Sequence, residues 1–448
     1  MNERKNLPNT YTTEPEVPQT EPLRKAVQNA RRRRRKKRNT LLASFLTVIA
    51  FAAIGFFAFF ELGKHTAVTP KAEESETPQT DAETPVSGNA ESTVQNEEMR
   101  GVWIASTINI NYPSEPGLSM AQLKAELDDI VKNTSEAGLN AIFFQVRPTS
   151  DALYPSKIFP YSKYLSGTQG QAPDGNFDSL AYLLEKAGAA GIAVHAWVNP
   201  YRVTMYASDE ATLCDTNPAK LHPEYTVKYA DGKTYYNPAL PEVRTLVADG
   251  VRELAENYPT LAGIHFDDYF YPYPKNGEDF DDAAAYALYG GGMDKAAWRR
   301  ENVNMLIKAS YDAVKAVNPN IKFGVSPFGI WANDGSDTPE KGSTSSGLEA
   351  YSSLYCDALA WAKGGYVDYL IPQLYWSFAT KAAPFDNMAR WWNAALDGTG
   401  VTYYIGHAAY KTPDYAENEI GIQVEFARNL LCYRGSVFYG YEDIRSEE

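Results

Sequence analysis

Short apolar segments alternate with longer segments of helical periodicity from Arg100 to the end of the chain. Apolar runs of this length, bounded by turn residues, are typical of buried strands. The pattern predicts strands at Arg100–Thr107, Asn140–Arg147, Ile192–Pro200, Gly263–Tyr269, Lys322–Gly329, Tyr369–Trp376, Thr402–Tyr410 and Ser436–Tyr441.

Segments with helical periodicity lie between these strands. The predicted helices are Ala121–Ala137, Phe177–Ala190, Pro241–Asn257, Lys295–Val317, Leu348–Lys363, Phe385–Leu396 and Glu417–Leu431. Strands that alternate with helices form a parallel sheet, and eight strands close a (β/α)8 barrel of the TIM type. A doubly wound open sheet is the alternative, but no glycine-rich phosphate loop supports it.

The predicted connections differ in length on the two ends of the barrel. Helix-to-strand connections are short, as at Gly138–Leu139 and Gly364–Gly365. Strand-to-helix connections are long, especially Thr149–Asn176, Tyr201–Leu240, Tyr271–Asp294 and Ile330–Gly347. Because the loops after the strands build the active site of such barrels, we expect the functional face at the C-terminal ends of the strands.

The part of the chain before the barrel differs in composition and in hydrophobic pattern. Residues 1–39 are polar and lack periodicity, which is typical of a disordered cytoplasmic tail. Segment 40–61 contains an unbroken apolar run, Leu41–Phe60, long enough to span a bilayer of about 30 Å. Residues 62–98 have the composition of a flexible stalk, and residues 99–448 form the barrel domain.

Lys and Arg precede the apolar run and Glu61 follows it, so the positive-inside rule places the N-terminus in the cytoplasm and the barrel outside the cell. We therefore expect a single-pass signal anchor in the cell membrane. A cleaved signal peptide is the alternative, but the run is long for one and no small-residue cleavage site follows Phe60 directly.

Charge argues against nucleic acid as a partner. The formal net charge is −14, and residues 1–39 are basic, so the rest of the chain is more acidic still. Phosphate binding needs a basic face. The basic block Arg31–Arg38 borders the apolar run and is better explained as a topology signal. The three cysteines, Cys214, Cys356 and Cys432, suit neither a disulfide framework nor a zinc site.

Polar and aromatic residues gather where the predicted strands end. The second strand ends in Gln145 and Arg147, and the fourth ends in Asp267, Asp268, Tyr269 and then Tyr271. The third strand ends in His195, Trp197 and Asn199, followed by Tyr201 and Arg202. The sixth ends in Gln373, Tyr375 and Trp376, the seventh contains His407, and Glu442 and Asp443 follow the eighth.

Six of these segments carry a resemblance to a known family. They read RGVWIAST, NAIFFQVRP, VHAWVNPYR, GIHFDDYFYP, FGVSPFGIW and IPQLYW, in that order. The chain from Met99 to Glu442 resembles the glycosyl hydrolase-like 10 family of bacterial envelope proteins. The resemblance implies a barrel that hydrolyses β-linked glycan, with peptide-stripped peptidoglycan strands as substrate class. It also implies that the acidic pair of strand four belongs to the active site.

Glycoside cleavage usually needs two carboxyl groups beside the scissile bond. The period of two along a strand puts His265 and Asp267 on one face, and apolar Phe266 on the other face should pack against the helices. Asp267 should therefore point into the barrel mouth. The second carboxylate is open: Asp268 and Asp443 are candidates, and Glu442 is preferred. The pair Asp267–Asp268 has a structural alternative as a strand-end cap.

Other strand-end residues are candidates for substrate binding, because sugars bind to aromatic faces and polar side chains. They are Arg147, Trp197, Asn199, Tyr201, Arg202, His265, Tyr269, Tyr271, Trp331, Gln373, Tyr375 and Trp376. The arginines have an alternative role in ion pairs that hold the fold, and the aromatic residues have one in core packing.

Two further classes of function stay open. The first is a metal-dependent hydrolase that uses His195, His265 and His407 with Asp267, although no HxH or HxxxH pair occurs among them. The second is a carbohydrate-binding barrel without catalysis. The favoured prediction needs no metal and no cofactor. Among glycans, poly-N-acetylglucosamine exopolysaccharide is the alternative to peptidoglycan.

Overall fold

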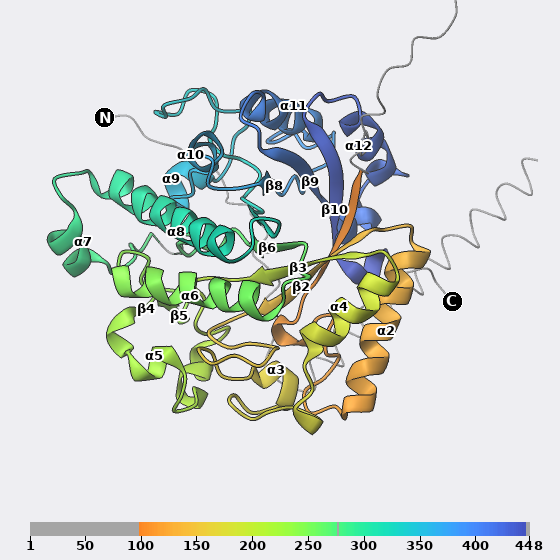
Figure 1. Ribbon diagram of the computed structural model, residues 1–448. Helices are drawn as coiled ribbons and strands as arrows, with labels where there is room; N and C mark the ends of the chain where they lie inside the picture. The colour runs from red at the N-terminus through yellow and green to blue at the C-terminus, as the bar shows by residue number, and fades with distance from the viewer. Residues whose placement is uncertain (1–97, 276, 445–448) are drawn as a thin grey trace, which may run out of the picture. The chain divides into compact units, whose positions relative to one another are not determined.

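The computed structural model describes residues 98–275 and 277–444. Within them, eight parallel strands close into a barrel in the order β1-β10-β9-β8-β7-β6-β3-β2 (Figure 1). The strands are β1 (Met99–Ile104), β2 (Ala141–Arg147), β3 (Ala193–Val198), β6 (Gly263–Phe266), β7 (Lys322–Val325), β8 (Tyr369–Leu370), β9 (Thr402–Ala408) and β10 (Tyr433–Tyr439). The closed barrel of eight parallel strands is confirmed, although β8 covers only two residues of the predicted strand Tyr369–Trp376.

The predicted tail, anchor and nearly all of the stalk lie outside the described residues. The apolar run Leu41–Phe60 is among them. In the described part of the chain, no helix combines the length and apolar character that crossing a bilayer requires.

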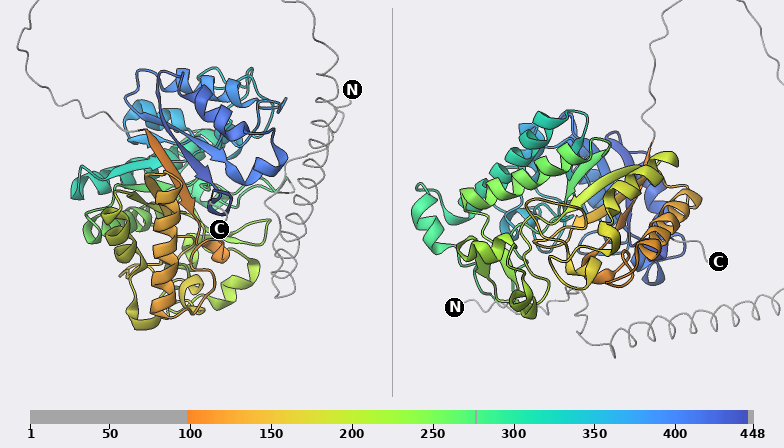
Figure 2. Two further views of the ribbon diagram at one scale, coloured as in Figure 1. Left: turned by 90° about the vertical axis from the view of Figure 1, so that its right-hand side faces the viewer. Right: turned by 60° about the horizontal axis from the view of Figure 1, so that its bottom comes forward.

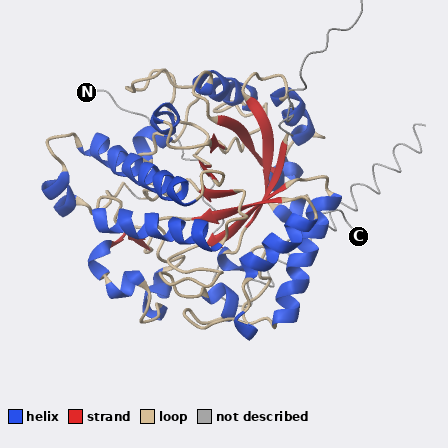
Figure 3. Cartoon of the chain, viewed as in Figure 1, coloured by secondary structure: helices blue, strands red, loops and turns tan. Residues whose placement is uncertain are grey.

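Helices surround the strands, as Figure 3 shows. The longer ones are α2 (Met120–Glu136), α4 (Ser179–Ala189), α6 (Pro241–Asn257), α8 (Lys295–Val317), α11 (Phe385–Leu396) and α12 (Glu419–Ala427). Helix α2 packs beside α4, and α6 beside α8 (Figure 2). Local signals start several of them: the side chains of Ser119, Asp178 and Asp294 accept hydrogen bonds from the first turns of α2, α4 and α8.

The predicted helix Leu348–Lys363 is wrong as a single element. The chain forms α9 (Ala350–Ser353) and α10 (Ala358–Gly364) instead. Between them, Tyr355 takes a left-handed conformation with φ of 53°, which an α-helix cannot accommodate. Asp357 then caps α10 by accepting a hydrogen bond from the Ala360 amide.

The long loops after the strands contain short elements of their own. They hold α3 (Lys163–Ser166), α5 (Pro218–Leu221), α7 (Ala283–Tyr289) and the antiparallel strands β4 (Thr226–Lys228) and β5 (Thr234–Tyr236). Short 3-10 turns are η1 (Thr107–Asn109), η2 (Asp174–Asn176), η3 (Ala207–Thr212), η4 (Pro223–Tyr225), η5 (Ala409–Asp414) and η6 (Tyr441–Asp443).

The core has two layers, separated by the strands. Side chains such as Ile264 and Phe266 pack in the outer layer, between strands and helices. Trp103, Phe143 and Tyr369 fill the barrel interior. A Cβ atom on Gly324 of β7 would lie 2.3 Å from the Tyr369 ring, so glycine is needed there to leave room for that ring.

Candidate active site

Asp267 directly follows β6, at the C-terminal end of the barrel. Its Oδ2 atom accepts a hydrogen bond from Asn199 Nδ2 at 3.1 Å. Its Oδ1 atom accepts from Gln373 Nε2 at 3.2 Å and from the backbone N–H of Asp268 at 2.9 Å. The side chain is buried, and Phe266 before it packs in the outer layer, as the strand alternation predicts. The ends of β3, β6 and β8 therefore meet at this carboxyl group.

Asn199 is held in turn by Gln145 of β2. Gln145 Nε2 donates to Asn199 Oδ1 at 2.7 Å, and Gln145 Oε1 accepts from the backbone N–H groups of Ser106 and Thr107, each at 2.9 Å. Sequence reasoning misses Gln145 as a member of the site. Its alternation with Phe143 on the inner face of β2 is the signal that could have found it.

Asp268 is buried and has a different environment from its neighbour. The Tyr273 hydroxyl donates to Asp268 Oδ2. The Tyr273 ring lies 5.7 Å from that of Tyr269, and the Arg202 guanidinium lies 4.2 Å from the centre of the Tyr269 ring. Asp268 therefore accepts from a tyrosine hydroxyl, while the positive charge of Arg202 acts on Asp267.

Burial raises the pKa of Asp267 above its ordinary value. The Asp268 backbone N–H, the positive charge of Arg202 and the Asn199 amide oppose this shift. Burial also raises the pKa of the Tyr375 hydroxyl, and negative charge at Tyr410 and Asp267 adds to the effect. A raised pKa moves a carboxyl group toward the range in which a general acid works.

Aromatic side chains that are half-buried or, at Tyr410, exposed gather at the same end of the barrel. One series of neighbouring rings runs Tyr269, Tyr273, Phe328 and Trp376, with successive centres 5.7, 6.1 and 5.8 Å apart. A second group contains Tyr375, Tyr410 and Tyr439, with Tyr375 and Tyr439 nearly parallel at 6.5 Å. Tyr269, Tyr375 and Trp376 are among the sugar-binding residues predicted from the sequence, and the other four rings lie beside them without having been predicted.

Several predicted substrate-binding residues lie in the packed layers instead. Arg147, Trp197, Tyr201, His265, Tyr271 and Trp331 are all buried. The Arg147 guanidinium lies 4.0 Å from the centre of the Phe159 ring, and Trp331 stacks on Trp391 at 5.8 Å. Asp267, Asn199 and Arg202 are buried as well, so burial does not separate the two roles, and substrate binding by these six residues stays a prediction beside the alternative of core packing.

Glu442 lies in the turn η6 that follows β10, and its side chain is exposed. The preceding Tyr441 is buried, and its hydroxyl accepts a hydrogen bond from Asn133 of α2 at 3.0 Å. Glu442 therefore stands at the correct end of the barrel. Its role as the second carboxylate stays a prediction.

The histidines on the strands are buried and hydrogen-bonded. His195 Nδ1 lies 3.0 Å from the Tyr369 hydroxyl, and His265 Nε2 lies 3.0 Å from Ser326 Oγ, both inside the barrel. His407 instead faces α12, with Nδ1 2.9 Å from Gln423 Oε1. Burial lowers the pKa of His195 to about 3 and that of His407 to about 4. Within residues 98–275 and 277–444, His, Cys, Asp and Glu side chains form no group of three that could hold a metal ion.

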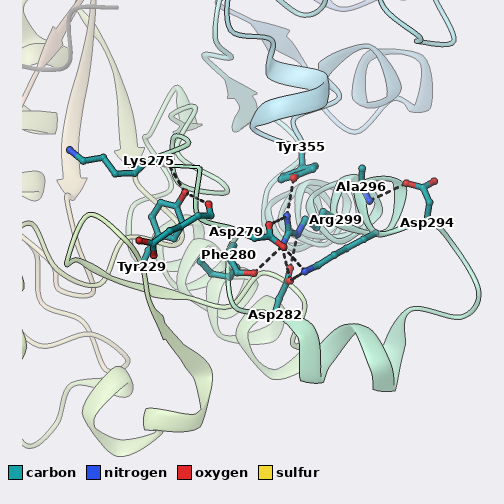
Figure 4. A network of polar contacts seen from close by, with 11 residues as sticks. Tyr229, Lys275, Asp279, Phe280, Asp282, Asp294, Ala296, Arg299 and Tyr355 are labelled. Carbon is teal, nitrogen blue, oxygen red and sulfur yellow. Dashed lines mark hydrogen bonds and ion pairs between the residues drawn. The ribbon is translucent and has the colours of Figure 1, made fainter. Parts of the chain in front are cut away.

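Arg299 of α8 fixes the loop that follows the acidic pair (Figure 4). Its guanidinium donates to both carboxylate oxygens of Asp282 at 2.8 and 2.7 Å and to Asp279 at 2.7 Å. It also donates to the Phe280 carbonyl at 2.9 Å and to the Tyr355 hydroxyl at 2.8 Å. This fork joins the β6–α8 connection to the segment between α9 and α10.

A closed (β/α)8 barrel with buried carboxyl groups and aromatic rings at its C-terminal end is the architecture of a barrel glycosidase. The glycosyl hydrolase-like 10 family model matches residues 98–421. The chain therefore belongs to the glycosyl hydrolase-like 10 family, which confirms the resemblance found in the sequence, and the protein is a glycoside hydrolase.

Relatives support this assignment. The chain is 39% identical over 370 residues to Glycosyl hydrolase YngK of Bacillus subtilis (strain 168), covering 80% of this chain and 71% of that one. It is 34% identical over 341 residues to Glycosyl hydrolase DigH of Escherichia coli (strain K12), covering 72% and 76%. The catalytic domain of beta-amylase from Paenibacillus polymyxa matches with a TM-score of 0.50 at 10% identity, covering 78% and 93%, which shows the fold alone.

Proposed function

We propose that this glycoside hydrolase is anchored in the cell membrane and cleaves β-linked amino-sugar glycan outside the cell, with peptide-stripped peptidoglycan strands as its substrate. One observation carries the catalytic part of the proposal. Asp267 is held by three N–H groups beside half-buried aromatic rings at the end of the barrel where the strands finish. The substrate class rests on the six family-like motifs, and the location rests on the charges around Leu41–Phe60.

Asp267 supplies the carboxyl group whose protonation state matters for cleavage. Burial raises its pKa, so it can hold the proton that the leaving glycosidic oxygen must receive. The hydrogen bonds from Asn199 and Gln373 fix the direction of the carboxyl group, which removes the need to orient it during the reaction. Asp267 is therefore the general acid in this proposal.

Gln373 offers an acceptor to the substrate. Its Nε2 atom donates both to Asp267 Oδ1 at 3.2 Å and to the Ser326 carbonyl at 2.9 Å. The Ser326 backbone carbonyl can only accept, so it fixes the orientation of the Gln373 amide whether or not Asp267 holds a proton. The Oε1 atom of this half-buried side chain is left to accept a hydroxyl or an acetamido N–H of the sugar next to the scissile bond.

The second carboxyl group decides the stereochemical outcome. Carboxyl groups about 5 Å apart support retention, whereas a separation of about 6.5–9.5 Å leaves room for an inverting water. Asp268 adjoins Asp267 in the chain, and Glu442 is an exposed residue of the turn that follows β10. We propose Glu442 as the partner, and Glu442→Gln should then remove activity while leaving glycan binding intact.

Product analysis tests the proposal. The full-length protein, purified in detergent, is incubated separately with peptide-free peptidoglycan strands and with poly-N-acetylglucosamine. New reducing ends are identified by mass spectrometry. Cleavage of the peptidoglycan strands supports the proposal, and cleavage of poly-N-acetylglucosamine alone supports an exopolysaccharide hydrolase. Retention of either glycan without new reducing ends would instead show a glycan-binding barrel.

A further inference from the structure

We infer that Gln145 is a positioning residue for Asp267 and acts on it through the side chain of Asn199. The inference rests on the proposed catalytic role of Asp267. Gln145 lies on β2, two strands away from the acid along the barrel order, and it has no direct hydrogen bond to Asp267 in the described structure. Its effect must therefore pass through Asn199.

The direction of every hydrogen bond in this chain of side chains follows from its first link. The backbone N–H groups of Ser106 and Thr107 can only donate, so the Gln145 atom that faces them must be Oε1. Nε2 of Gln145 then faces Asn199, whose facing atom must accept and is therefore Oδ1. Nδ2 of Asn199 is consequently turned toward the Asp267 carboxylate.

Burial makes the hydrogen bonds between Gln145, Asn199 and Asp267 costly to lose. Gln145 and Asn199 are each 1% exposed, so bulk water cannot replace a lost partner. A buried amide that loses its partner pays the full cost of desolvation, and networks of this kind tend to hold a single arrangement. Gln145 thus prevents a flip of the Asn199 side-chain amide. A flipped amide would direct its Oδ1 oxygen, instead of Nδ2, toward the Asp267 carboxyl group.

Charged and titratable groups also face Asp267, and they have to be held constant in any test. They are Arg202 from the loop after β3, Asp268 and Tyr273 from the loop after β6, and Tyr375 from the segment after β8. None of them is hydrogen-bonded to the Gln145 side chain in the described structure. Changes at position 145 therefore isolate the contribution of the amide chain.

Two variants remove the hydrogen bond that Gln145 Nε2 donates to Asn199, each in a different way. Gln145→Glu has the same shape and still accepts from the Ser106 and Thr107 N–H groups, but it cannot donate to Asn199 when ionised. Gln145→Met adds no charge and removes both functions. Ser106→Ala is the matched control. It deletes the hydrogen bond from Ser106 Oγ to the Gln145 backbone carbonyl at 2.8 Å and the long one to Gln145 Oε1 at 3.5 Å, but keeps both backbone N–H donors to Oε1 and the bond from Gln145 to Asn199.

The direct readout is the titration of Asp267 in the full-length protein. Aspartate labelled with carbon-13 at its side-chain carboxyl is followed by NMR, and Asp267→Asn assigns the signal. We expect the pKa of Asp267 to rise by about one unit in both Gln145 variants and to stay unchanged in Ser106→Ala. With glycan as substrate, kcat should fall at least about tenfold in the Gln145 variants while KM changes little.

An Asp267 titration in the Gln145 variants that matches Ser106→Ala would overturn the inference, whatever happens to thermal stability. If Gln145→Glu does not fold, Gln145→Met decides the question on the same readout. If the wild-type protein cleaves no glycan, the proposed function fails, but the NMR titration still measures whether Gln145 positions Asp267. The two failures are therefore distinguishable.

Discussion

Burial shifts the pKa values of Asp267 and of the histidines on the strands. The pKa of Asp267 is raised because the carboxyl group is buried away from water. Hydrogen bonds from N–H groups and the positive charge of Arg202 limit this shift. The histidines respond in the opposite direction, because burial disfavours their charged form. At the scale of single residues, burial therefore raises the pKa of Asp267 and lowers the pKa values of His195 and His407.

The buried histidines make stability depend on pH. The pKa of His407 is about 4 in the folded protein, below its ordinary value of about 6.5 in an unfolded chain. Between these two pKa values the unfolded chain binds a proton at His407 and the folded protein does not. The contribution of neutral His407 to the free energy of unfolding is therefore complete above about pH 6.5 and is lost as the pH falls toward 4. Between about pH 7 and about pH 5, His407 should account for a loss of about 2 kcal/mol in the free energy of unfolding.

Denaturant unfolding at the two pH values measures this loss. His407→Gln can keep hydrogen bonds to its neighbours and cannot titrate, so it should show a shallower pH dependence than the wild type. His222→Gln is the control for replacing a histidine at the surface, because the His222 side chain is about half exposed beside Glu224. Equal slopes in the wild type and His407→Gln would contradict the assignment.

Arg299 shows how elements are held around the site. All three of its guanidinium nitrogens donate, and its partners lie on the loop after β6 and on the break between α9 and α10. Removing one partner from a buried ion pair is costly, because the remaining charge loses its compensation. Arg299→Met should therefore lower the free energy of unfolding by about 3 kcal/mol.

Activity should fall in Arg299→Met even below the unfolding transition, because the same loop carries Asp268 and Tyr273. Denaturant unfolding and glycan cleavage are measured on the same preparation. Lys308→Met is the control: Lys308 pairs with Asp312 on the exposed side of α8 and should have little effect on either. A fully stable and active Arg299→Met variant would show that the loop is held by other contacts.

The barrel was predictable from the sequence because its strands are apolar runs and several helices have local start signals at Ser119, Asp178 and Asp294. The break at Tyr355 was not, because a left-handed residue leaves no trace in apolar periodicity. The orientation of Asp267, opposite to that of Phe266, followed from the alternation of side chains along a strand. The contact of Arg147 with Phe159 could not be predicted in this way, because the β2–β3 register shifts between Gln145 and Arg147, and its role in substrate binding stays a prediction.

At the scale of the whole molecule, the prediction concerns topology. Basic residues precede Leu41–Phe60 and Glu61 follows, so the barrel should lie outside the cell and residues 1–39 inside. Protease added to intact protoplasts should remove the barrel and leave the tail protected, as detected with tags at each end. A barrel that resists protease until the cells are lysed would contradict the proposed location.

The measurement that tests the central claim most directly compares the wild type with Asp267→Asn on peptide-free peptidoglycan strands. The substitution keeps the size of the side chain and removes its acid function. We expect kcat to fall at least about a hundredfold, or about 2.7 kcal/mol, with glycan binding and melting temperature nearly unchanged. An Asp267→Asn protein that forms new reducing ends at the wild-type rate would show that the catalytic centre is not at the end of β6.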